Sequence, residues 1–135
     1  MLVLIYFSFV IGLKVRSNYE YSAVEAAVHQ KLQFYMDKAN RNFHDIISYT
    51  DITDYMMDTT KDFGSTDTVY NLIKGLQTFT IRDIFCNYSI KEYGMDQYPY
   101  YMTLANEEYD NRLRRIQLGH NQFPMLNNIE SIREY

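Results

Sequence analysis

The stretch MLVLIYFSFVIGLKV, residues 1–15, governs the interpretation of the whole chain, because residues 1–13 are almost unbroken apolar. A helix that crosses the hydrocarbon core of a bilayer needs about 20 residues. A secretory signal would carry basic residues before its apolar run, whereas Lys14 and Arg16 follow it here. The run predicts a partial membrane-spanning helix with both cations at the interface. A hydrophobic strand or core helix of a soluble protein is the alternative.

Length and composition predict one folded domain. The chain has 135 residues, of which 47% are hydrophobic, so it can form a core and is not disordered by composition. Its net charge of −4 argues against a nucleic-acid-binding surface. The single cysteine, Cys86, excludes an intrachain disulfide and a multi-cysteine metal site. The 14 tyrosines suit half-buried surfaces, where the ring packs and the hydroxyl stays wet.

Three helices are predicted after the apolar segment. Residues 22–40 have apolar positions at approximately helical spacing and contain no glycine or proline. Ser22 and Glu25, three positions apart, form a capping-box pattern at its start. Residues 49–64 and residues 65–77 predict a second helix and a third, shorter one.

The pattern then changes. Residues 78–90 are rich in β-branched and aromatic residues and predict a strand. Residues 107–120 fit a helix or a strand, and residues 124–135 predict a helical turn. The expected fold is therefore a helix-rich α+β domain over residues 17–135 with a small antiparallel sheet. An apolar N-terminal helix over residues 1–16 precedes it.

One pair of residues has the spacing of an active site. Arg115 and His120 match the Arg-x4–6-His pattern of a class of small helical ribonucleases. In such a site the two groups would bind phosphate and transfer protons near neutral pH. Gly119 and Pro124 interrupt the long helix that this site needs. An ordinary surface arginine and a loop histidine are the alternative, and we expect no catalytic residues.

The remaining ionisable groups predict no metal or cofactor site. His29 and His44 are too far apart for one helical face and lack nearby ligands. Asp51, Asp54 and Asp58 lie at i, i+3 and i+7, so they share one face of the second predicted helix. We interpret this face as solvated, with weak attraction of calcium as the alternative.

The order of these segments resembles the region after the first transmembrane helix of polycystin-type cation channels (the polycystin/mucolipin family). There a segment of pattern Ser/Thr-x-Ile/Met-x-Asp-Phe-Trp starts a helix, and a strand of pattern Arg-hydrophobic-Arg-Gln-hydrophobic-Arg follows. The residues that match are Thr50, Ile52, Asp54, Tyr55, Met56, Arg112, Leu113, Arg114 and Ile116. Tyr55 and Met56 replace Phe and Trp, and Arg115 replaces the Gln. The family's paired cysteines and its five later membrane helices are missing.

The resemblance implies a membrane location with residues 17–135 on the extracytosolic side. Residues 1–16 would be the outer half of a first transmembrane helix, and the domain would act in subunit assembly and gating. Its partners would be other subunits of a homo- or hetero-oligomer and the membrane, without nucleic acid or cofactor. Asn87 begins an Asn-Tyr-Ser glycosylation acceptor, which agrees with this location. Two alternatives remain: a membrane-anchored interaction subunit of a larger complex, and the ribonuclease.

Overall fold

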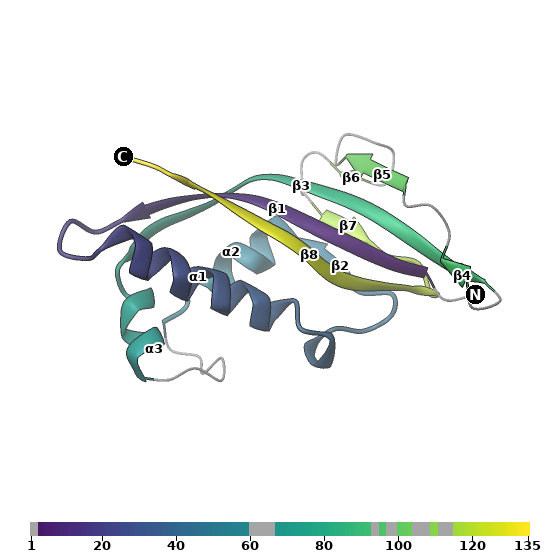
Figure 1. Ribbon diagram of the computed structural model, residues 1–135, viewed down its shortest axis with the longest axis horizontal. Helices are drawn as coiled ribbons and strands as arrows, with labels where there is room; N and C mark the ends of the chain where they lie inside the picture. The colour runs from purple at the N-terminus through teal and green to yellow at the C-terminus, as the bar shows by residue number, and fades with distance from the viewer. Residues whose placement is uncertain (1–2, 60–66, 93–94, 97–99, 104–108, 111–114) are drawn as a thin grey trace.

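A long, twisted sheet with helices on one face forms the body of the protein in the computed structural model (Figure 1). The model describes residues 3–59, 67–92, 95–96, 100–103, 109–110 and 115–135. The helices are α1 (Tyr21–Tyr35), the short 3-10 helix η1 (Lys38–Asn40), α2 (Tyr49–Met57) and α3 (Asp67–Ile73). The strands are β1 (Val3–Val15), β2 (Ile46–Ser48), β3 (Leu76–Glu92), β4 (Met95–Asp96), β5 (Tyr100–Thr103), β6 (Tyr109–Asp110), β7 (Arg115–Gln117) and β8 (Gln122–Arg133).

The apolar N-terminal run is an inner strand of this sheet, so the predicted apolar helix over residues 1–16 is wrong. Strand β1 lies between β3, to which it is antiparallel, and β8, to which it is parallel. Alternate side chains of β1 are at most 1% exposed from Ile5 to Leu13. The intervening side chains are half-buried on the opposite face. A strand with a partner on each side and little exposure on either face needs an almost continuous apolar sequence.

The channel interpretation loses its structural basis with this strand. In the described part of the chain, no helix has both the length and the apolar character needed to cross a membrane. The helix-rich fold class is also wrong, because the sheet is the larger component of this α+β domain. The expected transmembrane helix over residues 1–16 is therefore corrected, whereas the role in channel assembly and gating stays a prediction.

The three predicted helices exist, with shorter bounds. Helix α1 ends at Tyr35, and Glu20, without a side-chain capping bond, occupies its N-cap. Ser22 instead donates a hydrogen bond of 2.9 Å to Glu20 Oε1, so the predicted capping box is wrong. Helix α2 has its N-cap at Ser48, whose Oγ accepts a bond of 3.4 Å from the Asp51 amide.

The strand predicted over residues 78–90 is confirmed by β3, whereas the helical turn predicted over residues 124–135 is wrong. That segment belongs to β8, which pairs with β1 from Gln122 to Arg133. The ambiguous stretch 107–120 contributes β6 and β7, and β7 pairs with β2 in a second, three-stranded sheet. Partner strands, which local sequence does not reveal, decide both outcomes.

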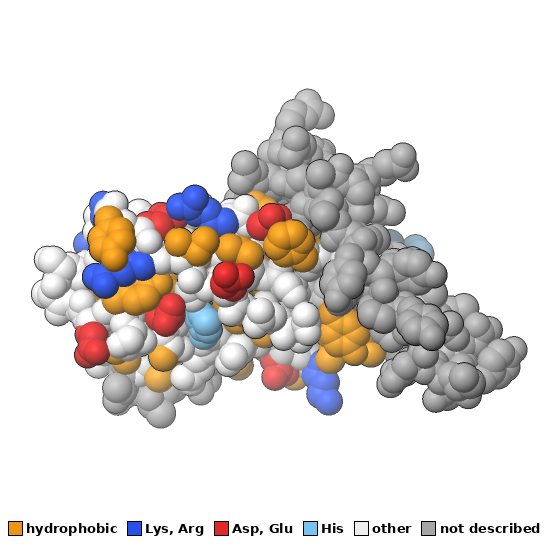
Figure 2. All heavy atoms as spheres, turned by 45° about the horizontal axis from the view of Figure 1, so that its top comes forward, with side chains coloured by type: hydrophobic (Ala, Val, Ile, Leu, Met, Phe, Trp, Pro, Cys, Tyr) orange, Lys and Arg blue, Asp and Glu red, His pale blue; other side chains and the backbone are white. Residues whose placement is uncertain are grey.

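The hydrophobic core fills the space between the sheet and the helices. Helix α1 contributes Val24, Val28 and Leu32, and α2 contributes Ile52 and Met56, all fully buried. Both helices pack on the same inner face of the sheet, and α3 packs against α1. In Figure 2, which turns the sheet side toward the reader, the described surface mixes apolar side chains with acidic and basic ones.

Candidate functional site

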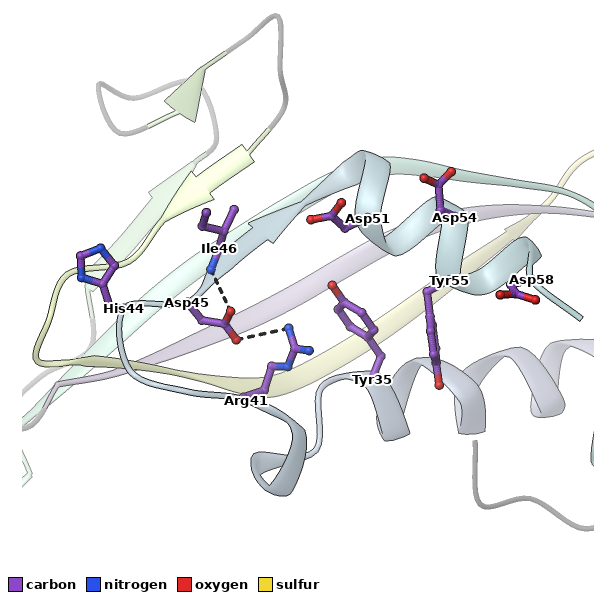
Figure 3. Close-up of a pocket in the computed structure, with 9 residues that line it drawn as sticks. All are labelled: Tyr35, Arg41, His44, Asp45, Ile46, Asp51, Asp54, Tyr55 and Asp58. Atoms are coloured by element: carbon purple, nitrogen blue, oxygen red, sulfur yellow. Dashed lines mark hydrogen bonds and ion pairs between the residues drawn. The ribbon is translucent and has the colours of Figure 1, made fainter. Parts of the chain in front are cut away.

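A pocket of about 540 Å³ opens between the C-terminal end of α1, the loop before β2, and α2 (Figure 3). Its lining residues are Tyr35, Arg41, His44, Asp45, Ile46, Asp51, Asp54, Tyr55 and Asp58. Two aromatic rings and four carboxylates therefore surround one guanidinium group and one imidazole. This combination is typical of surfaces that hold cations, since ring faces and carboxylates both attract positive charge.

The aromatic wall comes from two helices that meet at the pocket. Tyr35 projects from α1 and Tyr55 from α2, and their ring centroids are 5.0 Å apart with the planes inclined by 46°. The Arg41 guanidinium lies 4.3 Å from the Tyr35 ring centroid. Its Nη1 atom is 3.3 Å from Asp45 Oδ2. The pocket thus already holds one cation between an aromatic face and a carboxylate.

The acidic side of the pocket is the face of α2 that the spacing of its aspartates predicts. Asp51 and Asp54 lie on α2, whereas Asp58 is its C-cap residue with an extended backbone, so the predicted helix face does not extend to Asp58. All three nevertheless line the pocket. Within the described residues, Asp51 and Asp54 have no ion-pair partner. Four lining carboxylates against one guanidinium leave an excess of three negative charges with the imidazole neutral. The pocket therefore attracts further positive charge.

A buried lysine supports the aromatic wall from behind. Lys31 is fully buried, and its Nζ donates hydrogen bonds to the carbonyl oxygens of Met56, at 3.2 Å, and Asp58, at 2.6 Å. The same ammonium group lies 5.1 Å from the Tyr55 ring centroid. Burial lowers the pKa of Lys31 to about 8, and the charge of Asp58 partly opposes this effect. Lys31 thus ties the end of α2 to α1.

The Tyr55 hydroxyl is the one polar atom of the pocket wall that the described residues leave without a hydrogen-bond partner although it is buried. Burial and the neighbouring Tyr35 raise the pKa of Tyr55 to about 12, although the positive charge of Arg41 acts to lower this pKa. Burial raises the pKa of Tyr35 as well, and Arg41 opposes the effect. Both hydroxyls are therefore neutral near pH 7 and act as hydrogen-bonding groups, not as bases.

The residues of the channel-type pattern do not form one site. Thr50 is exposed, Asp54 and Tyr55 line the pocket, and Ile52 and Met56 lie in the core. The resemblance predicts that Tyr55 and Met56 are both buried, because they replace an aromatic pair that anchors the family's helix onto its sheet. Met56 is buried, whereas Tyr55 is only half-buried.

The strand part of that pattern is described only at its end. On an inner face of this strand Arg114 would need a carboxylate partner, such as Asp54 or Asp58, because an isolated buried charge is very costly. Residues 112–114 lie outside the described residues, so this ion pair stays a prediction. A strand here would place Gln117 on one face and Ile116 and Leu118 on the other. Ile116 and Leu118 are buried and Gln117 is exposed, which confirms this alternation. Asn87 lies within β3, between β1 and β5, and its glycosylation stays a prediction.

The ribonuclease pair lies outside the pocket. Arg115 is in strand β7 and His120 is in the turn that follows, so the helical frame of such a site is absent from this segment. Neither residue lines the pocket. His120 instead contacts His44, with 2.8 Å between the two Nδ1 atoms. In the described ranges, no group of three or more His, Cys, Asp or Glu side chains is placed to hold a metal ion.

Sequence reasoning did not assign Tyr35, Arg41 and Asp45 to a site, although they are three of the nine residues that line the pocket. The spacing of Arg41 and Asp45 by four residues was the available signal, but it lies in a loop and not in a helix. Comparison of the chain with known protein families, curated proteins and solved structures finds no match. The assignment of a function therefore rests on the pocket.

Proposed function

We propose that this domain is a binding module without catalytic activity, whose pocket receives a guanidinium or ammonium group of a partner protein. The position of Arg41 carries the proposal. Its guanidinium lies over the Tyr35 ring at 4.3 Å and beside Asp45 at 3.3 Å. The pocket thus displays on an internal side chain the contacts that an incoming cation would make.

The remaining lining groups supply a second set of such contacts. Asp51 and Asp54 stand in the wall without ion-pair partners in the described part of the chain. The Tyr55 hydroxyl is a buried acceptor without a hydrogen-bond partner among the same residues. An N–H donor that entered the pocket would pair first with the two exposed carboxylates, because the Tyr55 hydroxyl lies beneath the surface.

The strength of these contacts favours a partner protein over a free amine. An exposed cation–π contact contributes about 0.5–1 kcal/mol, and an exposed ion pair about 0.2–1 kcal/mol. One cation–π contact and two ion pairs together contribute about 1–3 kcal/mol. A dissociation constant of 1 mM requires about 4 kcal/mol, so these contacts alone give weaker binding than that. A useful affinity needs additional surface around the cation. Of the roles expected from the sequence, the proposal retains protein interaction and drops the membrane anchor.

Titration calorimetry tests the proposal with two ligands, a short Arg-Gly repeat peptide and spermidine. The test variant is Asp51→Asn combined with Asp54→Asn, which keeps the shape of the pocket and removes two charges. The matched control is Glu130→Gln, an exposed carboxylate on β8. We expect the peptide to bind the wild type and the control alike, and the double variant at least tenfold more weakly.

The two ligands distinguish the sources of the cation. Spermidine binding as tight as that of the peptide would contradict the partner-protein assignment and assign the pocket to free polyamines. Equal peptide affinity in the wild type and the double variant would refute the pocket as the binding site. Weaker affinity at higher salt is expected as well, because the contacts are between charges near the surface.

A further inference from the structure

Two histidines from distant parts of the chain meet at the edge of the pocket. His44 precedes β2, and His120 lies in the turn between β7 and β8. Their Nδ1 atoms are 2.8 Å apart. Their ring centroids are only 4.0 Å apart, with the planes inclined by 59°. The two Nδ1 atoms therefore lie closer together than the centres of their tilted rings.

The backbone holds this pair from both loops. The backbone amide of His44 donates a hydrogen bond of 3.3 Å to the carbonyl oxygen of Gln122. The backbone amide of Leu118 donates one of 2.9 Å to the carbonyl oxygen of Asp45. The Gln117 side chain donates to the His44 carbonyl oxygen at 2.9 Å. His44 itself has a φ of 62°, in the left-handed region. A non-glycine residue rarely adopts this conformation, and here it directs the imidazole toward His120.

We propose that His44 and His120 form a two-histidine chelate for a divalent transition-metal ion that prefers square-planar geometry, Cu²⁺ or Ni²⁺. Bonds from imidazole nitrogen to such a metal are about 2.0–2.1 Å long. Two of them meeting at the right angle of a square-planar ion hold the nitrogens about 2.9 Å apart. In the metal-free pair the separation is the 2.8 Å of a hydrogen bond, which is about 0.1 Å from the square-planar value and about 0.5 Å short of the roughly 3.3 Å that the tetrahedral angle of Zn²⁺ requires.

The chelate needs little rearrangement. In the metal-free pair, one Nδ1–H donates a hydrogen bond to the Nδ1 atom of the other ring. In the chelate each ring instead carries its proton on Nε2, which leaves both Nδ1 atoms able to bind the metal. Both side chains are exposed, so water can complete the coordination shell. No third protein ligand is placed there within the described residues. The site would thus be an accessible one, next to the pocket that His44 also lines.

The third histidine of the chain provides a matched control. His29, on α1, bonds to the Ser131 hydroxyl on β8 and to neither His44 nor His120. The test variants are His120→Asn and His44→Asn, since asparagine tolerates the left-handed backbone at position 44. The control is His29→Asn. CuCl2 and NiCl2 are titrated into the full chain by calorimetry, with MgCl2 as a hard cation that imidazole does not favour, and circular dichroism checks each fold.

We expect one Cu²⁺ and one Ni²⁺ to bind the wild type and His29→Asn with equal affinity. In His44→Asn and His120→Asn the affinity should fall at least tenfold. Electron paramagnetic resonance of the Cu²⁺ complex should show two imidazole nitrogens in the wild type and one in His120→Asn, which separates loss of a ligand from loss of fold. Equal Cu²⁺ affinity in all three variants, or a loss in His29→Asn alone, would overturn the assignment. His44 lines the pocket whereas His120 does not, so the result for His120→Asn separates the chelate from the cation pocket.

Discussion

Replacing Lys31 by methionine should remove an unusual rise of stability with pH. The wild-type ammonium group is buried and bonded to the carbonyl oxygens of Met56 and Asp58. Methionine fills much of the same volume and carries no charge. Because α2 ends beside this ammonium group, the substitution also removes the cation at a helix C-terminus, a stabilising position for positive charge.

The sign follows from proton binding. The pKa of Lys31 is lowered from 10.5 to about 8 in the folded protein, first by burial. Between these values the unfolded chain binds more protons than the folded one, so the free energy of unfolding rises with pH. At 1.36 kcal/mol per pKa unit, the gain between about pH 7 and about pH 9.5 is about 2 kcal/mol. This gain in the free energy of unfolding is absent below about pH 7, because Lys31 is protonated there in both the folded and the unfolded chain.

Urea unfolding of the wild type, Lys31→Met and Lys74→Met at both pH values measures this difference. Lys74 is an exposed lysine whose Nζ lies 4.9 Å from the Tyr70 ring centroid, so its variant matches the change of residue without a buried charge. We expect the wild type and Lys74→Met to gain about 2 kcal/mol and Lys31→Met to gain much less. Parallel pH dependence in the wild type and Lys31→Met would refute the assignment of a buried, pKa-shifted lysine.

Two further pairs of substitutions test the site and the sheet. Tyr55→Phe removes a buried hydroxyl without a hydrogen-bond partner in the described residues, so thermal unfolding should show unchanged or higher stability, by up to about 1 kcal/mol. Tyr55→Ala also removes the ring that packs on Tyr35 and should cost about 2–3 kcal/mol; equal effects of the two substitutions would contradict the packing. Phe7→Ala, in the core at 0% exposure, should cost about 3–5 kcal/mol. Phe85→Ala, at 39% exposure on β3, should cost less than about 1 kcal/mol, and a reversed order would mean that β1 does not face the core.

How far the sequence predicted the fold depended on whether an element is defined locally. Helix α1 and strand β3 have their own periodicity or composition, and both were found. Strand β1 was mistaken for a helix because a continuous apolar run has no period that separates the two. Its many β-branched and aromatic residues, among them Val3, Phe7 and Ile11, were the overlooked signal.

Elements stabilised by distant partners could not be predicted. The segment around Asn127 and Asn128 has little strand propensity, and it is a strand because β1 offers a row of backbone partners. The pocket shows the same limit. The aspartates of α2 were correctly placed on one helix face, but Tyr35 and Arg41 reach them only through the packing of α1 against α2.

The parallel pairing of β1 with β8 gives this fold a high contact order. The side-chain amide of Asn127 donates a hydrogen bond of 3.0 Å to the Ser8 hydroxyl, although the two residues are 119 positions apart in the chain. At a synthesis rate of 5–20 residues per second, β1 leaves the ribosome roughly 5–20 s before β8 is available to it. Until then one backbone edge of β1 lacks its native partner, and the strand is exposed to pairing with other chains. Cotranslational folding would therefore stop at the antiparallel β1–β3 pair, and holdase chaperones would find their binding site in β1, residues 3–15.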